Sequence, residues 1–141
     1  MFEDLLRDAI AVLAYGGVGI ALMGLGFVYV DIITPGKLRE LIWVERNPNA
    51  ALLLASNLLG LGGVIVASIF ASDGRLAFGL ASTAVYGVLG LILIGVSFLL
   101  LDWITPGKLG DVLCEPHLHP GTLVSSAAHL AVAAVAAAAI V

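Results

Sequence analysis

The sequence predicts an all-α integral membrane protein with four transmembrane helices, arranged as two parallel two-helix repeats. Of its 141 residues, 61% are hydrophobic and only 11% are charged, whereas about a quarter of the residues in a soluble domain are charged. Four long runs carry no charged residue, and each is long enough to cross a hydrocarbon core of about 30 Å. A stretch of 24 residues also occurs twice. These three observations predict the fold class.

The duplicated stretch is Tyr15–Leu38, which recurs 71 positions later as Tyr86–Leu109 with 13 of the 24 aligned residues identical. Self-similarity of this kind indicates an internal duplication. We expect one membrane domain made of two repeats, residues 1–72 and 73–141. Because each repeat holds two spans, both repeats share one orientation and are related by a pseudo-two-fold axis along the membrane normal.

The four uncharged runs predict the transmembrane spans in order. The first follows a short acidic segment, Met1–Asp8, and this acidic flank and the length of the run argue against a signal peptide. A polar turn, Ser72–Arg75, separates the second span from the third. The fourth span is rich in alanine, so we expect it to depend on neighbouring helices. The spans are Ala9–Val30, Ala50–Ala71, Leu76–Leu101 and Thr122–Val141.

Each loop after the first and third spans contains the same five residues, Thr-Pro-Gly-Lys-Leu. Threonine as N-cap and proline at the first helical position predict a short amphipathic helix in the headgroup layer. A Pro-Gly turn without a helix is the alternative for both loops. We call residues 31–49 and 102–121 the TPGKL loops. The motif residues are Thr34, Pro35, Gly36 and Lys37, and Thr105, Pro106, Gly107 and Lys108.

The basic residues predict the orientation of the chain in the membrane. Four of them lie in the TPGKL loops and two, Arg7 and Arg75, lie on the opposite side. Because Lys and Arg accumulate on the cytoplasmic side, we expect both TPGKL loops in the cytoplasm and both termini outside. The four loop residues are Lys37, Arg39, Arg46 and Lys108.

Glycines recur at equivalent positions of the first and third spans. Small residues let helices in a bilayer approach closely, and these glycines share a helix face with other duplicated residues. We therefore expect the two glycine faces to meet near the pseudo-axis and to form the centre of the bundle. The predicted packing residues are Gly16, Gly19 and Gly24, and Gly87, Gly90 and Gly95.

The duplicated arrangement, Thr34-Pro35, the NPNAALLLASNLL pattern of Asn47–Leu59 and the following Gly60 together resemble the DUF350 family, also called the UPF0719 transmembrane proteins. The resemblance implies a small protein of the bacterial cell (inner) membrane, built from two-span units. It also implies partnership with envelope-stress or polyamine-related proteins encoded nearby. It supplies no catalytic residues.

Two duplicated acids, Asp31 and Asp102, stand where the first and third spans leave the membrane. The simplest interpretation is that each acid is solvated at the helix exit or paired with the lysine six residues later, Lys37 or Lys108. The alternative is a pair of carboxylates across the pseudo-axis, forming a cation-attracting ring at a pore mouth.

Four further polar side chains lie within or near the spans. Asn57 and His129 align when the repeats are compared with a slip of one residue. Polar groups at that depth form interhelical hydrogen bonds or mark a transport path, and both interpretations stay open. Tyr15 and Tyr86 are expected as aromatic anchors at the membrane surface, with cavity lining as the alternative.

One short segment contains residue types that bind metals. Cys114, His117 and His119 could supply three zinc ligands, but no second Cys/His pair exists and the first repeat has Trp43 in place of Cys114. We therefore expect no metal site and no cofactor. No catalytic fingerprint occurs, so an enzyme is not expected. The net charge of −4 without a basic patch gives no sign of nucleic-acid binding.

Two functional hypotheses follow. The first is a structural or partner-binding membrane module in the lipid bilayer that forms a homo-oligomer and presents the TPGKL loops to a cytoplasmic protein. The second is a small ion or solute channel or transporter, whose path runs from Asp31 and Asp102 past Asn57 and His129. A hydrated cavity along those residues would favour the second, and a dry centre packed with glycine would favour the first.

Overall fold

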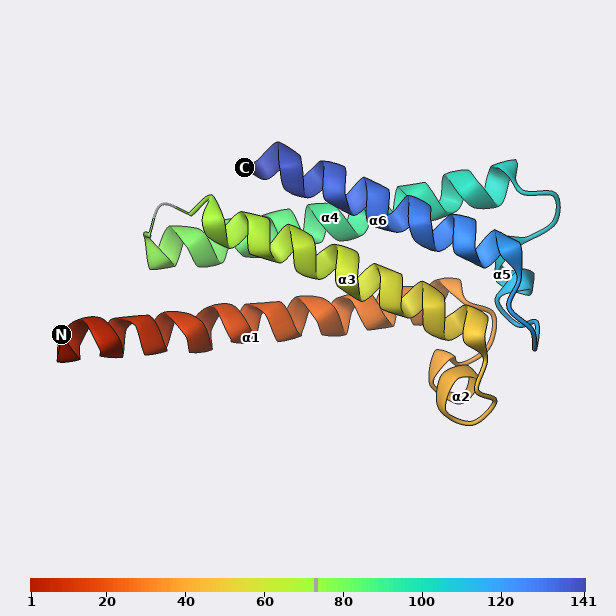
Figure 1. Cartoon of the computed structure of the whole chain (residues 1–141), viewed down its shortest axis with the longest axis horizontal. Helices are drawn as coiled ribbons and strands as arrows, with labels where there is room; N and C mark the ends of the chain where they lie inside the picture. Colours follow the sequence, from red (N-terminus) through yellow and green to blue (C-terminus); the bar gives the residue numbers. More distant parts are fainter. Residues whose placement is uncertain (73) are drawn as a thin grey trace.

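The computed structural model describes residues 1–72 and 74–141, in which all regular structure is helical (Figure 1). Four helices are long and apolar enough to cross a membrane, and a short helix follows the first and the third of them, so the predicted fold class is confirmed. The predicted turn at Ser72–Arg75 includes Asp73, which lies outside the described residues. The helices are α1 (Phe2–Ile33), α2 (Leu38–Trp43), α3 (Pro48–Phe70), α4 (Leu76–Ile104), α5 (Leu109–Val112) and α6 (Pro120–Ile140).

Helix α1 begins well before the predicted span. The acidic segment that precedes the apolar run is helical, and Glu3 and Asp4 lie in the first turn, where acidic side chains interact favourably with the helix dipole. Helices α1 and α4 both end directly before a Thr-Pro pair. This boundary has a steric cause, because the residue that precedes a proline is disfavoured in helical conformation.

The centre of the bundle is α3 rather than a meeting of α1 with α4. Helix α3 packs most extensively on α6 and also contacts α4 and α1. In its most apolar window, 56% of α3 is buried, compared with 17% for α1. Figure 1 shows α3 crossing between α1 and α6, with α4 behind it. The predicted centre, built from the glycine faces of the first and third spans, is therefore wrong.

The contact between α1 and α4 places large side chains of α1 against glycines of α4. Leu22 lies against Gly87, and the ring of Tyr29 lies against Gly95. Gly90 of the same helix receives Val64 of α3. These α4 glycines do serve close packing, because a side chain there would displace its neighbour.

The equivalent glycines of α1 do not pack inside the chain. Gly16, Gly19 and Gly24 have no other residue within 4 Å of the position that a Cβ atom would occupy. The prediction that they line the contact with α4 is wrong. In a close helix contact a large side chain of one helix packs against a glycine of the other, so two glycine faces do not meet directly. Helix α1 supplies the large side chains of that contact, so its glycines point elsewhere.

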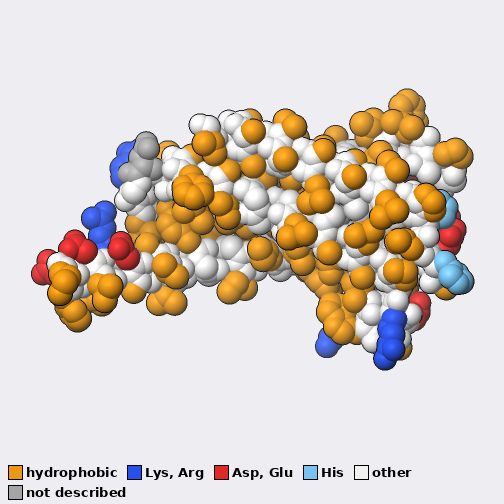
Figure 2. Space-filling model, in the orientation of Figure 1, with side chains coloured by type: hydrophobic (Ala, Val, Ile, Leu, Met, Phe, Trp, Pro, Cys, Tyr) orange, Lys and Arg blue, Asp and Glu red, His pale blue; other side chains and the backbone are white. Residues whose placement is uncertain are grey.

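The surface of the bundle fits a membrane-spanning orientation. Hydrophobic side chains cover its length, and charged side chains gather at the two ends (Figure 2). One end carries the N-terminal turns of α1, and the other carries the TPGKL loops, and both ends show acidic as well as basic side chains. This distribution leaves the middle of the bundle for the hydrocarbon core.

Candidate functional site

The two TPGKL loops have the same internal structure. The carboxylate of Asp31 accepts a hydrogen bond from the backbone N–H of Leu38 at 2.8 Å, and that of Asp102 accepts one from Leu109 at 2.7 Å. Each acid thereby satisfies one free N–H at the start of α2 or α5. The acids hold the loops in shape, and in the described residues neither forms an ion pair with the following lysine. Lys37 lies 3.7 Å from Glu40 instead.

The threonines of the motif end one helix and do not begin the next, so the N-cap prediction for them is wrong. The hydroxyl of Thr34 donates to the carbonyl of Val30 at 2.8 Å, and Thr105 repeats this bond with Leu101 at 2.6 Å. The proline forces an extended residue before it, and the following glycines have φ values of 94° and 95°. A short helix therefore follows a bend at the Pro-Gly pair in both loops, and the alternative of a Pro-Gly turn without a helix is wrong.

The short helices bury their apolar faces in protein. Leu38 and Leu109, the last residues of the duplicated stretch, are 0% and 1% exposed and belong to one core cluster with the ends of α1, α3 and α4. The loops also contact each other, because the thiol of Cys114 donates to the carbonyl of Pro35 at 3.2 Å. The two loops thus form one continuous surface at this end of the bundle.

Asn49 joins the second loop to α3, a role that no sequence motif indicates. Its side-chain amide donates to the carbonyls of Glu115 and His117 at 3.0 and 2.7 Å. Its carbonyl oxygen accepts from the N–H of His119 at 2.8 Å and from the hydroxyl of Thr122 at 2.9 Å. A polar side chain at the second position of an apolar helix was the available signal, because such a residue needs partners when buried.

Asn47 supports the same junction. Its side-chain oxygen accepts from the N–H groups of Asn49 and Ala50 at 2.8 and 3.1 Å, and so caps α3. Its amide nitrogen also donates to the Glu115 carbonyl at 3.0 Å. An asparagine before a proline is a strong helix-start pattern, so the sequence alone indicates the cap but not the bond across the repeats.

Cys114, His117 and His119, the potential metal ligands of the second loop, make separate contacts and do not form one site. Nδ1 of His119 accepts from the N–H of Gly121 at 2.9 Å and caps α6. The backbone carbonyl of His117 accepts a hydrogen bond from the Asn49 side chain, and Cys114 is exposed. Within residues 1–72 and 74–141, no three Cys, His, Asp or Glu side chains come close enough to hold a metal ion. The arrangement therefore serves the loop structure.

Four buried polar side chains lie on α3 and α6, the two helices with the most extensive contact. Asn57 and His129 each lie nine residues past the first residue of their helix, about 14 Å along the axis. Asn57 is 2% exposed and His129 is 0% exposed. Ser125 and Ser126 precede His129 by about one turn and are equally buried. We call these four residues the polar cluster.

The side chains of the polar cluster have no hydrogen-bond partner among the described residues. Helix α3 approaches α6 one turn beyond Asn57, where a Cβ on Gly60 would lie 2.7 Å from the Cβ of Ala133. The ring of His129 lies 6.0 Å from that of Phe98 on α4. An unpaired buried polar group costs about 1–3 kcal/mol, so several at one depth single out this position.

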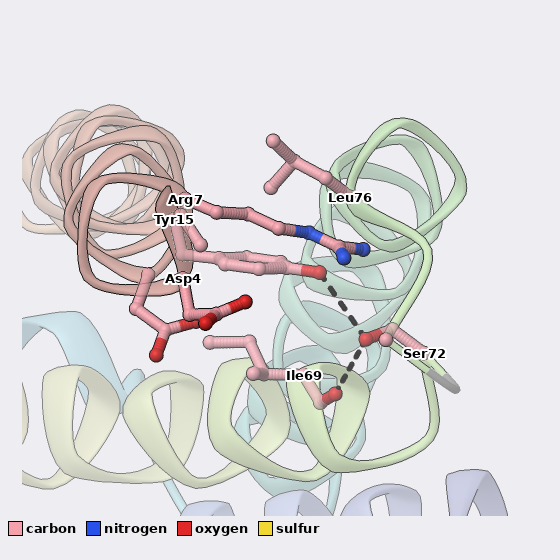
Figure 3. A pocket seen from close by; sticks show the side chains of 9 residues that line it. Asp4, Arg7, Tyr15, Ile69, Ser72 and Leu76 are labelled. Atoms are coloured by element: carbon pink, nitrogen blue, oxygen red, sulfur yellow. Dashed lines mark hydrogen bonds between the residues drawn. The ribbon is translucent and has the colours of Figure 1, made fainter. Parts of the chain in front are cut away.

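The end of the bundle opposite the TPGKL loops has an open cleft of about 440 Å³. Figure 3 shows Tyr15 of α1 reaching across it to the end of α3. The tyrosine hydroxyl donates to the Ser72 hydroxyl at 3.2 Å, which donates to the carbonyl of Ile69 at 2.7 Å. The lining includes charged residues of α1 but neither Asn57 nor His129. Tyr86, the repeat equivalent of Tyr15, is half-buried on α4.

Comparison with known proteins gives a consistent result. The family model described as "Domain of Unknown Function (DUF350)" matches residues 4–140. The chain is 40% identical over 138 residues to a UPF0719 transmembrane protein of Mycolicibacterium paratuberculosis. This alignment covers 98% of this chain and 91% of the relative. It is also 40% identical over 136 residues to UPF0719 transmembrane proteins of Mycobacterium bovis and Mycobacterium tuberculosis, covering 96% of this chain and 90% of each relative. No solved structure matches the chain.

Proposed function

Because the chain belongs to the DUF350 family of UPF0719 transmembrane proteins, we propose that it acts as a non-catalytic membrane module that assembles into a homo-oligomer. The observation that carries this proposal is that the rest of the chain leaves most of α1 uncovered. Only 17% of its most apolar window is buried within the chain, and three of its glycines leave space for another helix. Small residues are where helices associate in a bilayer.

The module presents a double loop to one side of the membrane. In this proposal the membrane is the bacterial inner membrane, both TPGKL loops are cytoplasmic, and both termini lie outside. The duplicated Asp31 and Asp102 bonds give the two loops the same internal shape, and the Cys114 thiol contacts Pro35 across them. Lys37 is 78% exposed at its side chain. A cytoplasmic protein is the proposed partner of this surface, which carries four basic and six acidic residues.

The oligomer is tested by native mass spectrometry of the full chain released from detergent or nanodiscs. We expect one discrete assembly larger than the monomer. A monomer at every protein concentration would contradict the proposal.

The orientation is tested with Cys114, which is the single cysteine of the chain and is exposed. A membrane-impermeant maleimide should label Cys114 only after cells are permeabilised. Labelling in intact cells would place the TPGKL loops outside and overturn the orientation.

A channel or transporter is the second candidate, and the polar cluster favours it, because buried polar groups without partners commonly line transport paths. Proteoliposomes that hold the chain should then pass a defined ion or polyamine. Flux should fall in His129→Ala and persist in Leu130→Ala, a neighbouring substitution at a partly exposed position. Silent liposomes over a broad panel of solutes would reject this candidate.

A further inference from the structure

The second repeat carries an open apolar groove between α4 and α6. Its volume is about 370 Å³, and Leu93 on its α4 side is 46% exposed. Nothing else in the described chain covers it, since α1 packs on α3 and α4. The lining residues are Leu93, Ala131, Val132, Val135, Ala136 and Ala139.

The same groove exists in the first repeat, where it is filled. Between α1 and α3 lies helix α4, whose Gly87 receives Leu22 and whose Gly90 receives Val64. Leu22 is 3% exposed in this contact. The offset of 71 places Leu93 at the position of Leu22, and the slipped offset of 72 places Ala136 at the position of Val64.

The glycine face of α4, which fills the groove of the first repeat, has an equivalent on α1. Gly87, Gly90 and Gly95 of α4 are equivalent to Gly16, Gly19 and Gly24 of α1. The α4 glycines are in contact, and the α1 glycines are open. The chain therefore has one groove and one glycine face left over. The contact already formed between its two repeats shows that such a groove and such a face fit.

We propose that α1 of a second copy of this chain lies in the α4–α6 groove with its glycine face inward. Leu93 then lies against Gly16, and Ala136 lies against Gly19 of the neighbouring copy. Leu100, which corresponds to Tyr29, lies against Gly24. All three contacts keep the membrane depth of their counterparts, because every repeat has the same orientation. The inference rests on the proposed oligomer and gives its interface.

This contact joins two different surfaces and is heterologous. A head-to-tail contact gives a discrete assembly only when its rotation closes, so the discrete oligomer proposed above is a ring. A second copy is a better occupant than an unrelated helix, because the chain itself carries the glycine pattern that fits the equivalent groove of its first repeat. Lipid chains in the groove would leave the glycine face without a partner.

Disulfide cross-linking between differently tagged copies tests the interface. In a Cys114→Ser background, a Gly16→Cys copy is co-expressed with a Leu93→Cys copy and oxidised in the membrane. Because each copy has one cysteine, a disulfide between the tags forms only between chains. We expect a cross-linked heterodimer, and its loss when Ile92→Cys replaces Leu93→Cys. Ile92 lies at the same depth and is 54% exposed, but it faces about 100° away.

A second variant separates this inference from the proposed function. Gly16→Leu should leave the helix content of the chain unchanged, since no residue surrounds that position, and should abolish the oligomer in native mass spectrometry. Ala21→Leu, about 140° around α1 from Gly16 and about 160° from Gly19, should keep the oligomer. An oligomer without the Gly16–Leu93 cross-link, or one that survives Gly16→Leu, overturns the interface while the proposed function stands. A monomeric wild type overturns both.

Discussion

Replacement of Asn49 by alanine should destabilise the fold more than any other single polar substitution at the loop end of the bundle. The side chain is 0% exposed and forms four hydrogen bonds, with the backbones of Glu115, His117 and His119 and the hydroxyl of Thr122. Each hydrogen bond contributes about 0.5–1.5 kcal/mol net, so four contribute about 2–6 kcal/mol. We expect about 2–4 kcal/mol, because water can reach the two loop carbonyls after the change.

The free energy of unfolding is measured by titrating SDS into mixed micelles and following the loss of helix by circular dichroism. Thr122→Val is the matched control, since it removes one of the four bonds and should cost about 1 kcal/mol. The loop should also come away from α3 in Asn49→Ala, which exposes the amides of Glu115 and of residues 117–119 to hydrogen exchange. A loss no larger than that of Thr122→Val would refute the conclusion that Asn49 joins the two repeats.

Three further predictions follow from the described contacts. Gly87→Leu should lose about 1–3 kcal/mol of stability by overpacking against Leu22, whereas Gly16→Leu should stay within about 0.5 kcal/mol of wild type in monomeric micelles; equal losses in SDS titrations would contradict this. Burial and the nearby carboxylates of Asp111 and Glu45 raise the pKa of the Cys114 thiol. Less thiolate is therefore present at neutral pH, and maleimide labelling should be slower than for an ordinary exposed cysteine, rise with pH, and speed up in Asp111→Asn; a rate that is flat with pH would count against it. Asp31→Asn should weaken the bond to the Leu38 amide by about 1 kcal/mol and raise its hydrogen exchange roughly fivefold, and an unchanged rate would show that the charge of Asp31 is not needed.

The helices themselves could be predicted from the sequence to within a few residues at most ends. Uncharged runs fix the spans, since a charge inside the hydrocarbon core is costly, and α3 and α4 begin within two residues of their predicted starts. The start of α1 was predicted too late, because the acidic segment before the apolar run is itself helical. The role of Thr34 was also mispredicted, since a Thr-Pro pair can end one helix as well as begin another.

The candidate site was predictable only in part. Depth and alignment single out Asn57 and His129, and the structure buries both side chains, on α3 and α6. Asn49 was missed, because its importance comes from partners about 70 residues away. Helical periodicity says which residues share a face, but it does not say which face meets which neighbour.

The sequence by itself determined that the chain is a duplicated four-span membrane protein, because charge, run length and self-similarity are local properties that the bilayer selects directly. Only the tertiary structure decided how the two repeats use their equivalent surfaces. In the contact between the two repeats, the first repeat supplies the groove between α1 and α3, and the second supplies α4, the helix that fills it. The glycines of α4 therefore have side chains packed against them, whereas the equivalent glycines of α1 have none. The glycine spacing is the same in both helices, so this difference arises from packing alone.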